Sequence, residues 1–458
     1  MRILLALFCA FFVIAEAHAT SLQQAVRWAI ETNPKIDAAQ ANYRATEYVL
    51  EQAKGRLFPE IELSGDVGEQ VIDRPNGLGP DVNDRTRTRK QATLSIRQVL
   101  FDGFDRANDI YRSEVRISAA SGRILARAEA VALSAIEAYL DIGRHQNLLG
   151  LARSNVKRHR TLLQLIRSRV DGGKAPASDY EQTLERLEAA KALQARIEVA
   201  LGTAKAKYKN VVGRKAGKLK RVKHARGIPN SPDKIFEIAL RNNPELQVLD
   251  AEAVIADYDR LQFKSSLYPQ LFLEGSATRG EDLEGTPGRN DELKASIVLS
   301  WKLFDGGVRR NREMELAEHV SQKRFEQQSK ARDIREEIDI SWVRLKSGAA
   351  EVSALGRQVK QNQQLVDSYT NEYEADKRSL LDVLDAESSK FASEFEFYNA
   401  QALNIFSSYQ LLAGMSSLLD HLGVEKPVGS SLPTSKSSNT GFGAIKFNNK
   451  ELEIPSLR

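Results

Sequence analysis

A long internal duplication limits what this chain can fold into more than any other feature of its sequence. Matching motifs occur twice in the same order, first at an offset of 210 residues and then at 203: Ala29–Pro34 with Ala239–Pro244, Leu57–Pro59 with Leu267–Pro269, Leu100–Gly103 with Leu303–Gly306, and Asp179 with Asp382. The change of offset needs one gap, and the turn-rich stretch 74–80 provides a place for it. The duplication predicts two copies of one architecture in a single chain.

Each half contains two stretches in which polar and apolar residues alternate. They lie between the Leu-aromatic-Pro motif and the Leu-Phe-Asp-Gly motif, and so predict a β-hairpin at 58–103 and another at 269–306. Period-two patterning over about ten residues is the weak signature of barrel strands that face lipid on one side and a lumen on the other. Two ordinary hairpins on a soluble protein would show the same alternation, so the pattern by itself leaves both interpretations open.

The rest of the chain has the pattern of long helices in coiled coils. Proline is scarce, at 13 of 458 residues, and 104–170 contains none while its apolar residues recur in alternating steps of three and four. That stretch of 67 residues would form a helix of ~100 Å. The other expected helices cover 178–212, 232–267, 307–376, 380–415 and 22–57. In each half, two short helices end to end match the long one: 178–212 with 232–267, and 380–415 with 22–57. We therefore expect a helical rod of ~100 Å with a sheet at one end.

The N-terminus has the pattern of a secretory signal peptide. Arg2 supplies a positive charge, 3–14 is apolar, and Ala17-His18-Ala19 fits the small-x-small cleavage site, although a retained anchor is the alternative. The only cysteine, Cys9, lies in this segment, so we expect no disulfide or thiolate metal site in the mature chain. The predicted organisation is a signal peptide at 1–19, a half-helix at 20–57, a hairpin at 58–103, helices at 104–212, a basic linker at 213–231, a half-helix at 232–268, a hairpin at 269–306, helices at 307–424 and a flexible tail at 425–458.

Strand arithmetic predicts an oligomer. Four strands cannot close a membrane barrel, which needs at least eight. Two chains would give eight strands, but side chains fill the interior of so small a barrel. The predicted fold is therefore mainly α with a membrane β-barrel: a trimeric twelve-stranded barrel, with four strands from each chain, on a long α-helical coiled-coil tunnel.

Taken together, in order and in duplicate, the motifs resemble the TolC-like outer membrane factor family. The resemblance covers 22–423 and rests on the following segments: Asn33-Pro34, Asn243-Pro244, the two Leu-Phe/Tyr-Pro and two Leu-Phe-Asp-Gly motifs, and Leu380–Glu387. It implies a homotrimer in the outer membrane of a Gram-negative cell, surrounded by outer membrane lipid and extending into the periplasm. It also implies a periplasmic adaptor (membrane fusion protein) and an inner-membrane transporter as partners, with no nucleic acid, no cofactor and no metal.

The resemblance implies an acidic constriction at the periplasmic end. The matching positions are Asp382 and Asp385, and three copies would place six carboxylates in a narrow ring that selects cations. The residues themselves also permit a simpler interpretation, because carboxylates at a helix start stabilise the helix dipole whatever the function.

The family's gate links match four further residues. Tyr373 and Arg378 lie on one side, and Ser178 and Asp179 on the other. An Arg378–Asp179 pair would be a charge-assisted bond, and its loss would favour the open gate. Asp179 could equally serve only the start of its own helix.

Within the family, Arg378–Asp382 and Tyr409–Ala413 look most like the type I protein-secretion branch, which exports unfolded proteins with an ABC-type transporter. A tripartite channel for drugs or other small molecules is the alternative within the family, and a periplasmic coiled-coil structural protein is the alternative of another class. No Ser-His-Asp order or zinc motif occurs, so we expect no enzyme and no catalytic residue. The basic run from Arg214 to Arg226 is interpreted as a solvated link between helices rather than a nucleic-acid or lipid site.

Overall fold

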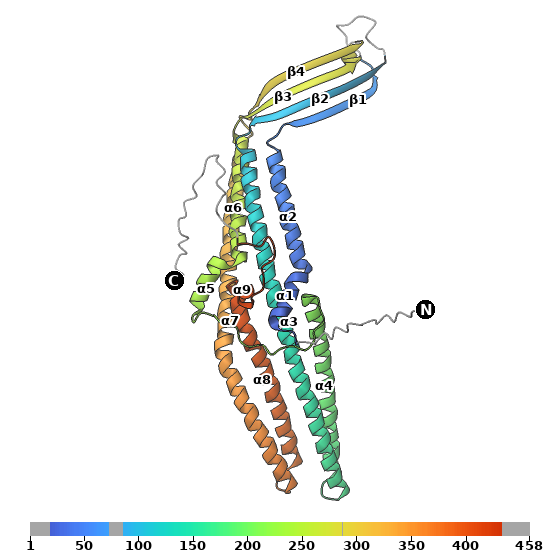
Figure 1. Ribbon diagram of the computed structural model, residues 1–458, viewed down its shortest axis with the longest axis vertical. Coiled ribbons are helices and arrows are strands. Elements are labelled where there is room, and N and C mark those ends of the chain that lie inside the picture. The colour runs from blue at the N-terminus through green and yellow to red at the C-terminus, as the bar shows by residue number, and fades with distance from the viewer. Residues whose placement is uncertain (1–18, 73–85, 286, 433–458) are drawn as a thin grey trace, which may run out of the picture. The chain divides into compact units, whose positions relative to one another are not determined.

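The structure is a computed structural model that describes residues 19–72, 86–285 and 287–432, so the expected signal peptide, Cys9 and the stretch 74–80 lie outside the described residues. The described residues form two compact units, whose helices and strands are labelled in Figure 1: unit 1 comprises 19–45, 120–250 and 324–432, and unit 2 comprises 46–72, 86–119, 251–285 and 287–323. The elements in chain order are α1 (Leu22–Thr32), α2 (Pro34–Gly55), β1 (Glu60–Gln70), β2 (Arg87–Phe101), α3 (Asp105–Asp171), α4 (Ala177–Val212), α5 (Pro232–Asn242), α6 (Pro244–Lys264), the 3-10 helix η1 (Ser265–Leu267), β3 (Gln270–Glu281), the 3-10 helix η2 (Leu283–Gly285), β4 (Arg289–Ser300), α7 (Val308–Glu374), α8 (Leu380–Gly414) and α9 (Leu418–Leu422). In the described part of the chain, no helix combines the length and the apolar character needed to cross a membrane.

The half-helices expected at 22–57 and 232–267 are each broken at an Asn–Pro pair. Asn33 has φ −85° and ψ 117°, and Asn243 has φ −71° and ψ 118°, because the ring of the following proline disfavours the helical conformation in the residue before it. Each Asn side-chain oxygen then accepts a hydrogen bond from the backbone N–H two residues on, at 3.1 and 3.0 Å. This bond caps the second helix. The same short motif thus breaks and restarts the helix in both halves.

The same asparagines determine which half-helices meet, and the expected pairing is wrong. The Asn33 amide donates to the backbone oxygen of Val211 near the end of α4 (3.1 Å). The Asn243 amide donates to Gly414 O at the end of α8 (3.2 Å). The N-terminal half-helix therefore meets α4, and the half-helix after the linker meets α8, which exchanges the partners expected from chain order. The physical reason is that helix C-terminal carbonyls lack intrahelical donors, and each Asn amide supplies one.

Small side chains on α3 form the centre of the unit 1 core. Ala128, Ala132, Ala135 and Ala138 are fully buried together with Ile142, as expected from the heptad pattern. Alanine lets neighbouring helices approach α3 closely, and larger buried side chains such as Tyr208 and Leu411 fill the rest of the core.

A buried tyrosine ties two extended segments to this core. Tyr139 is 2% exposed, and its hydroxyl lies 2.7 Å from the carbonyl oxygen of Thr20 and 2.8 Å from that of Lys220. The same two segments pair directly, because Thr20 N donates to Lys218 O and Lys220 N donates to Thr20 O. The linker after α4 is therefore held in place by backbone hydrogen bonds.

Residues 425–432 differ from the expectation of a flexible tail. The Ser121 hydroxyl on α3 donates to Gly429 O at 2.6 Å, and the Gln40 amide donates to Val428 O at 3.1 Å. Val424 is buried and Leu432 packs against the unit 1 core. Val428 is 87% exposed, so the hydrogen bonds, together with the contact of Leu432, hold this segment against the helices. The rest of the expected tail lies outside the described residues.

Unit 2 contains an antiparallel sheet with the strand order β1-β2-β3-β4. Its register places one row of apolar residues across all four strands: Leu63, Leu94, Ala277 and Leu293. The next row, on the opposite face, is polar: Glu62, Ser95, Ser276 and Lys294. The alternation predicted from the sequence is thus one apolar face and one polar face on a single sheet.

The Leu-Phe-Asp-Gly motif starts both long helices of the duplication. Asp102 accepts from the backbone N–H and the guanidinium of Arg106, and Asp305 does the same with Arg309. Gly103 has φ +66°, and a side chain at this position would come within 2.7 Å of Ser265 O. The motif is therefore a helix cap with a charged partner one turn later, and glycine is required at the turn.

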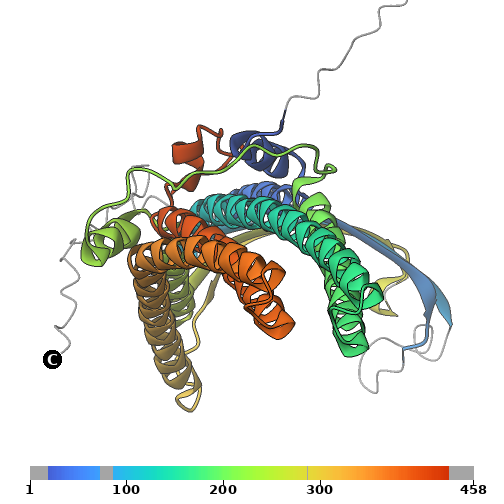
Figure 2. The same cartoon turned by 90° about the horizontal axis from the view of Figure 1, so that it is seen from below.

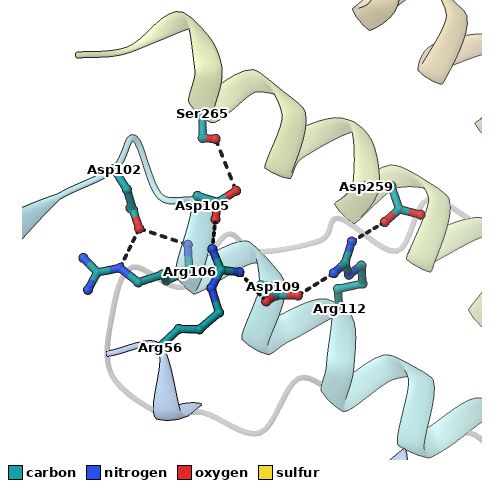
Figure 3. Close-up of polar contacts among 8 residues, drawn as sticks. All are labelled: Arg56, Asp102, Asp105, Arg106, Asp109, Arg112, Asp259 and Ser265. Atoms are coloured by element: carbon teal, nitrogen blue, oxygen red, sulfur yellow. Dashed lines mark hydrogen bonds and ion pairs between the residues drawn. The ribbon is translucent and has the colours of Figure 1, made fainter. Parts of the chain in front are cut away.

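An ionic network joins the helices beside the first of these caps (Figure 3). Arg56 at the end of α2 pairs with Asp105 and Asp109, both at 2.7 Å. Asp109 also pairs with Arg112, whose guanidinium reaches Asp259 on α6 at 2.6 Å. The network connects α2, α3 and α6 within unit 2 because Arg56, Asp109 and Arg112 each have two charged partners.

Burial perturbs one carboxyl group in the unit 1 core and generates a prediction. Glu129 on α3 is 5% exposed, and burial raises its pKa to about 7. The backbone N–H groups of Leu418 and Leu419 offset part of this rise. Within the described residues, however, neither carboxylate oxygen of Glu129 meets a donor with full hydrogen-bonding geometry. Because the pKa lies above the ordinary value of 4.5, the folded state favours the protonated group. Its stabilisation is complete below about pH 4.5 and is lost as the pH rises through 7.

We expect Glu129→Gln to remove this pH dependence. At pH 8 the variant should unfold with a free energy about 3 kcal/mol higher than the wild type, and at pH 4.5 the two should be nearly equal. Guanidinium unfolding of the detergent-solubilised protein, followed by circular dichroism, measures both. Glu181→Gln, at an exposed position on α4, is the matched control. Equal pH slopes for wild type and Glu129→Gln would contradict the assignment.

Candidate functional site

Two helical hairpins of unit 1 end in turns, and all the residues singled out for the gate lie in these turns or in the adjoining ends of the helices. The first turn lies between α3 and α4 (172–176), and the second lies between α7 and α8 (375–379). A separate apolar cluster joins the hairpins next to these turns: Leu162 and Ile166 from α3, Tyr373 from α7, and Leu380, Val383 and Leu384 from α8. Tyr180 of α4 packs against it. We refer to this region as the hairpin tips.

Asp382 and Asp385 lie in the first turns of α8. The Ser379 hydroxyl accepts from the backbone N–H of Asp382 at 3.2 Å and lies 2.8 Å from its carboxylate. Ser379 is thus the N-cap of α8, and the Asp382 carboxylate accepts from its hydroxyl, so Asp382 does serve the helix start. Asp385 is exposed one helical turn later, and the Asp382 side chain is 43% exposed. Both carboxylates therefore remain accessible to an ion, and capping does not compete with that role.

Arg378 makes its contacts within its own hairpin. Its guanidinium pairs with Glu372 at 2.9 Å and lies 3.8 Å from Asp382. It also lies 4.2 Å from the centroid of the Tyr369 ring. The chain reverses at Asp376, whose φ is +58°, and this directs the Arg378 side chain back along α7. Among the described residues of the chain, the expected Arg378–Asp179 pair is not formed.

The other two expected gate residues differ in burial. Tyr373 is 6% exposed within the cluster at the hairpin tips. Burial raises its pKa, the Arg169 charge lowers it, and the charges of Asp179 and Asp376 raise it further. Asp179 is half-buried in the first turn of α4, whereas Ser178 is exposed. The structure thus places Tyr373 in the apolar cluster at the hairpin tips and leaves Arg378 on its own hairpin.

Two arginines that the sequence did not single out connect the hairpins. Arg169, in the last turn of α3, pairs with Asp376 in the α7–α8 turn, and its guanidinium lies 5.0 Å from the centroid of the Tyr373 ring. We call this contact the tip latch. About three helical turns farther from the tip along α3, Arg158 pairs with Glu387 of α8. The side chain of Glu387 is 4% exposed. An arginine in the last turn of a helix, such as Arg169, is common because its charge stabilises the helix dipole. The local sequence therefore gave no sign that it pairs with Asp376.

The arrangement has the chemistry of a charged opening rather than of a reaction centre. Within the described residues, no group of three or more His, Cys, Asp or Glu side chains is placed to hold a metal ion. The exposed acids of α8 and the ion pairs between the hairpins can attract cations and hold two helical elements together.

Comparisons with known proteins identify the family of this chain. The sequence model of the family described as "Outer membrane efflux protein" matches residues 25–214 and 235–412, which lie in both repeats. "Outer membrane efflux protein BepC" of Brucella suis biovar 1 (strain 1330) is 24% identical over 400 residues, covering 87% of this chain and 86% of the relative. "Alkaline protease secretion protein AprF" of Pseudomonas aeruginosa is 24% identical over 439 residues, covering 93% of this chain and 90% of the relative.

A solved structure shares the fold. The Campylobacter jejuni CmeC outer membrane channel superposes with a TM-score of 0.76 at 12% identity, covering 87% of this chain and 86% of that one. The TolC-like resemblance, the mainly helical fold with four antiparallel strands and the localisation are confirmed. Members of this family are transport proteins, not enzymes, and they form homotrimers that work with adaptors and inner-membrane transporters. Because the family's sequence model spans most of both repeats, this chain belongs to the outer membrane efflux protein family and is an outer-membrane channel of a trans-envelope efflux or secretion system that extends into the periplasm of a Gram-negative cell.

Proposed function

We propose that this chain is the passive duct of a type I secretion system, which carries unfolded proteins delivered by an ABC-type inner-membrane transporter. The two-faced sheet is the main observation that supports the function of a duct. Leu63 and Leu293 are 74% and 86% exposed on its apolar face, as expected of side chains that meet lipid. Glu62 and Lys294 lie on the opposite face, as expected of a water-filled lumen.

The sheet also supports closure by three copies. Strands β1 and β4 each have a neighbour on one side only. Unpaired backbone groups at such edges are costly in lipid, so the edges of one copy would pair with those of the next. Three copies supply twelve strands, and the helices of unit 1 would then form the wall of the periplasmic duct.

The choice of cargo rests on one relative and two sequence segments. AprF is named for alkaline protease secretion and matches along 93% of this chain, and Arg378–Asp382 and Tyr409–Ala413 point to the same branch. BepC, named as an efflux protein, favours a tripartite channel for small molecules as the second candidate. Crosslinking in cells followed by identification of the inner-membrane partner separates the two. An ABC-type transporter is expected, and a proton-driven pump would contradict protein secretion.

We further propose that the hairpin tips are the gate and that the tip latch holds it closed. Arg169→Ala removes both the pair with Asp376 and the contact with the Tyr373 ring. A loss of ~1 kcal/mol would raise the ratio of open to closed channels about fivefold. Single-channel recording in planar bilayers measures this as higher conductance or open probability.

A neighbouring pair on the same helix is the control for the latch. Arg153 pairs with Glu198 of α4 at 3.5 Å, and both side chains are exposed. Arg153→Ala should leave the conductance unchanged. Arg378→Ser tests the Arg378–Asp179 pair expected from the sequence. A higher conductance for Arg378→Ser, with no change for Arg169→Ala, would reject the tip latch as the closing contact.

We propose that the exposed Asp382 and Asp385 of α8 form the constriction of the channel. Three copies of the chain would then place six carboxylates in a ring. Asp382→Asn with Asp385→Asn keeps the size of both side chains and removes the charge. We expect block by a trivalent cation added on the periplasmic side to weaken by on the order of tenfold. Asp171→Asn, at an exposed position at the other turn, should leave the block intact. Equal block in wild type and double variant would exclude these residues from the constriction.

A further inference from the structure

The segment between α4 and α5 concentrates positive charge. We call residues 213–231 the linker strap. It contains seven basic residues and no Asp or Glu: Arg214, Lys215, Lys218, Lys220, Arg221, Lys223 and Arg226. Outside the strap, the chain contains the remaining 59 of its 66 Lys and Arg residues and all 61 of its Asp and Glu residues. The strap therefore accounts for more than the entire net charge of +5, whereas a segment selected only for solubility would mix both signs.

The strap is extended, but it is held firmly along its length. Its apolar residues pack against the unit 1 core at regular spacing: Ala216, Leu219, Val222, Ala225 and Ile228. Besides Tyr139, the Tyr409 hydroxyl donates to Lys223 O at 3.0 Å, and Ala225 N donates to the Ser408 hydroxyl at 2.9 Å. The backbone is thus fixed to α3 on one side and to α8 on the other.

Because the apolar side chains point inward, the basic ones point to solvent. All seven are exposed, and within the described residues none of them forms an ion pair with a carboxylate. Arg214 lies 4.5 Å from the centroid of the Trp28 ring, which keeps its charge uncompensated. Figure 2 shows the strap running past α1 and α9, on the convex side of the arc formed by α4, α3, α8 and α7 in unit 1.

The exposed face of the strap lacks what a folded protein partner needs. Interfaces between folded proteins depend on aromatic or apolar anchors that enter pockets, and every apolar side chain of the strap packed on the core is turned away from solvent. A row of unpaired cations on a rigid backbone suits an extended polyanion instead, since such binding is electrostatic and needs no shape complementarity.

We propose that the linker strap binds an anionic cell-wall polymer, one that carries carboxylates along an extended chain in the periplasm. Three straps in the homotrimer would form a basic belt of 21 charges on the outside of the duct. The belt would tie the channel to the cell wall, and neither the cargo nor the gate would take part. The proposal rests on the periplasmic location of the family and not on the secretion branch.

The test is co-sedimentation of the detergent-solubilised trimer with purified Gram-negative cell-wall sacculi. The wild-type trimer should sediment at low salt, and soluble poly-L-glutamate should release it. Lys218→Gln with Arg221→Gln and Arg226→Gln should lower the bound fraction about tenfold. These substitutions leave the backbone anchors of the strap in place.

A triple variant on α4 is the matched control. Arg196, Lys205 and Lys209 are exposed cations outside the strap, and their replacement by Gln should leave sedimentation unchanged. Heat-modifiable trimer on gels and unchanged conductance verify that both variants are assembled. No sedimentation of the wild type, an equal loss in both variants, or no release by poly-L-glutamate would each overturn the proposal. Stronger strap-dependent binding to phosphatidylglycerol vesicles than to sacculi would assign the surface to lipid and overturn it as well.

Discussion

The hydrogen bond from an Asn amide to the C-terminal carbonyl of another helix organises this fold. Asn33 and Asn243 each end one helix, cap the next, and bond to the last turn of a third helix, α4 or α8. The proline that follows each Asn keeps the Asn backbone out of the helical conformation. The Asn side chain then accepts from an unpaired N–H at the helix start and donates to an unpaired carbonyl at the end of another helix. Two short helices can therefore stack against one long helix without leaving backbone groups unsatisfied.

The remaining packing of unit 1 follows from small side chains and from extended segments tied down by polar ones. Alanines on α3 allow close helix contact, and the linker strap and residues 425–432 lie across the helices rather than beside them. The linker strap packs its apolar residues against the core on one side, so its polar residues are presented on the other. The solvent-facing side of the linker strap is basic because its polar residues point outward and residues 213–231 contain no Asp or Glu.

Charge has a different use at the hairpin tips. There the arginines of α3 reach across to α7 and α8, while the acids of α8 point to solvent next to a capping serine. Glu387 is buried and would carry an uncompensated charge without Arg158, so this pair constrains the hairpins more strongly than an exposed pair could. Exposed acids, in contrast, are free to interact with a passing ion.

The sequence by itself determined the duplication, the lengths of the long helices and the two-faced sheet, because each depends on local periodicity or on a motif of a few residues. Asn-Pro breaks a helix at both of its positions, and the Leu-Phe-Asp-Gly motif precedes a long helix at both of its positions. Only the tertiary structure decided that 22–57 meets α4 and 232–267 meets α8, that Arg169 pairs with Asp376 rather than Arg378 with Asp179, and that residues 425–432 are packed. These contacts join residues separated by about 170 to 310 positions. The entropy of closing such long loops changes little with their length, so chain order does not select among the possible partners, and the choice falls to packing and hydrogen bonding in the folded chain.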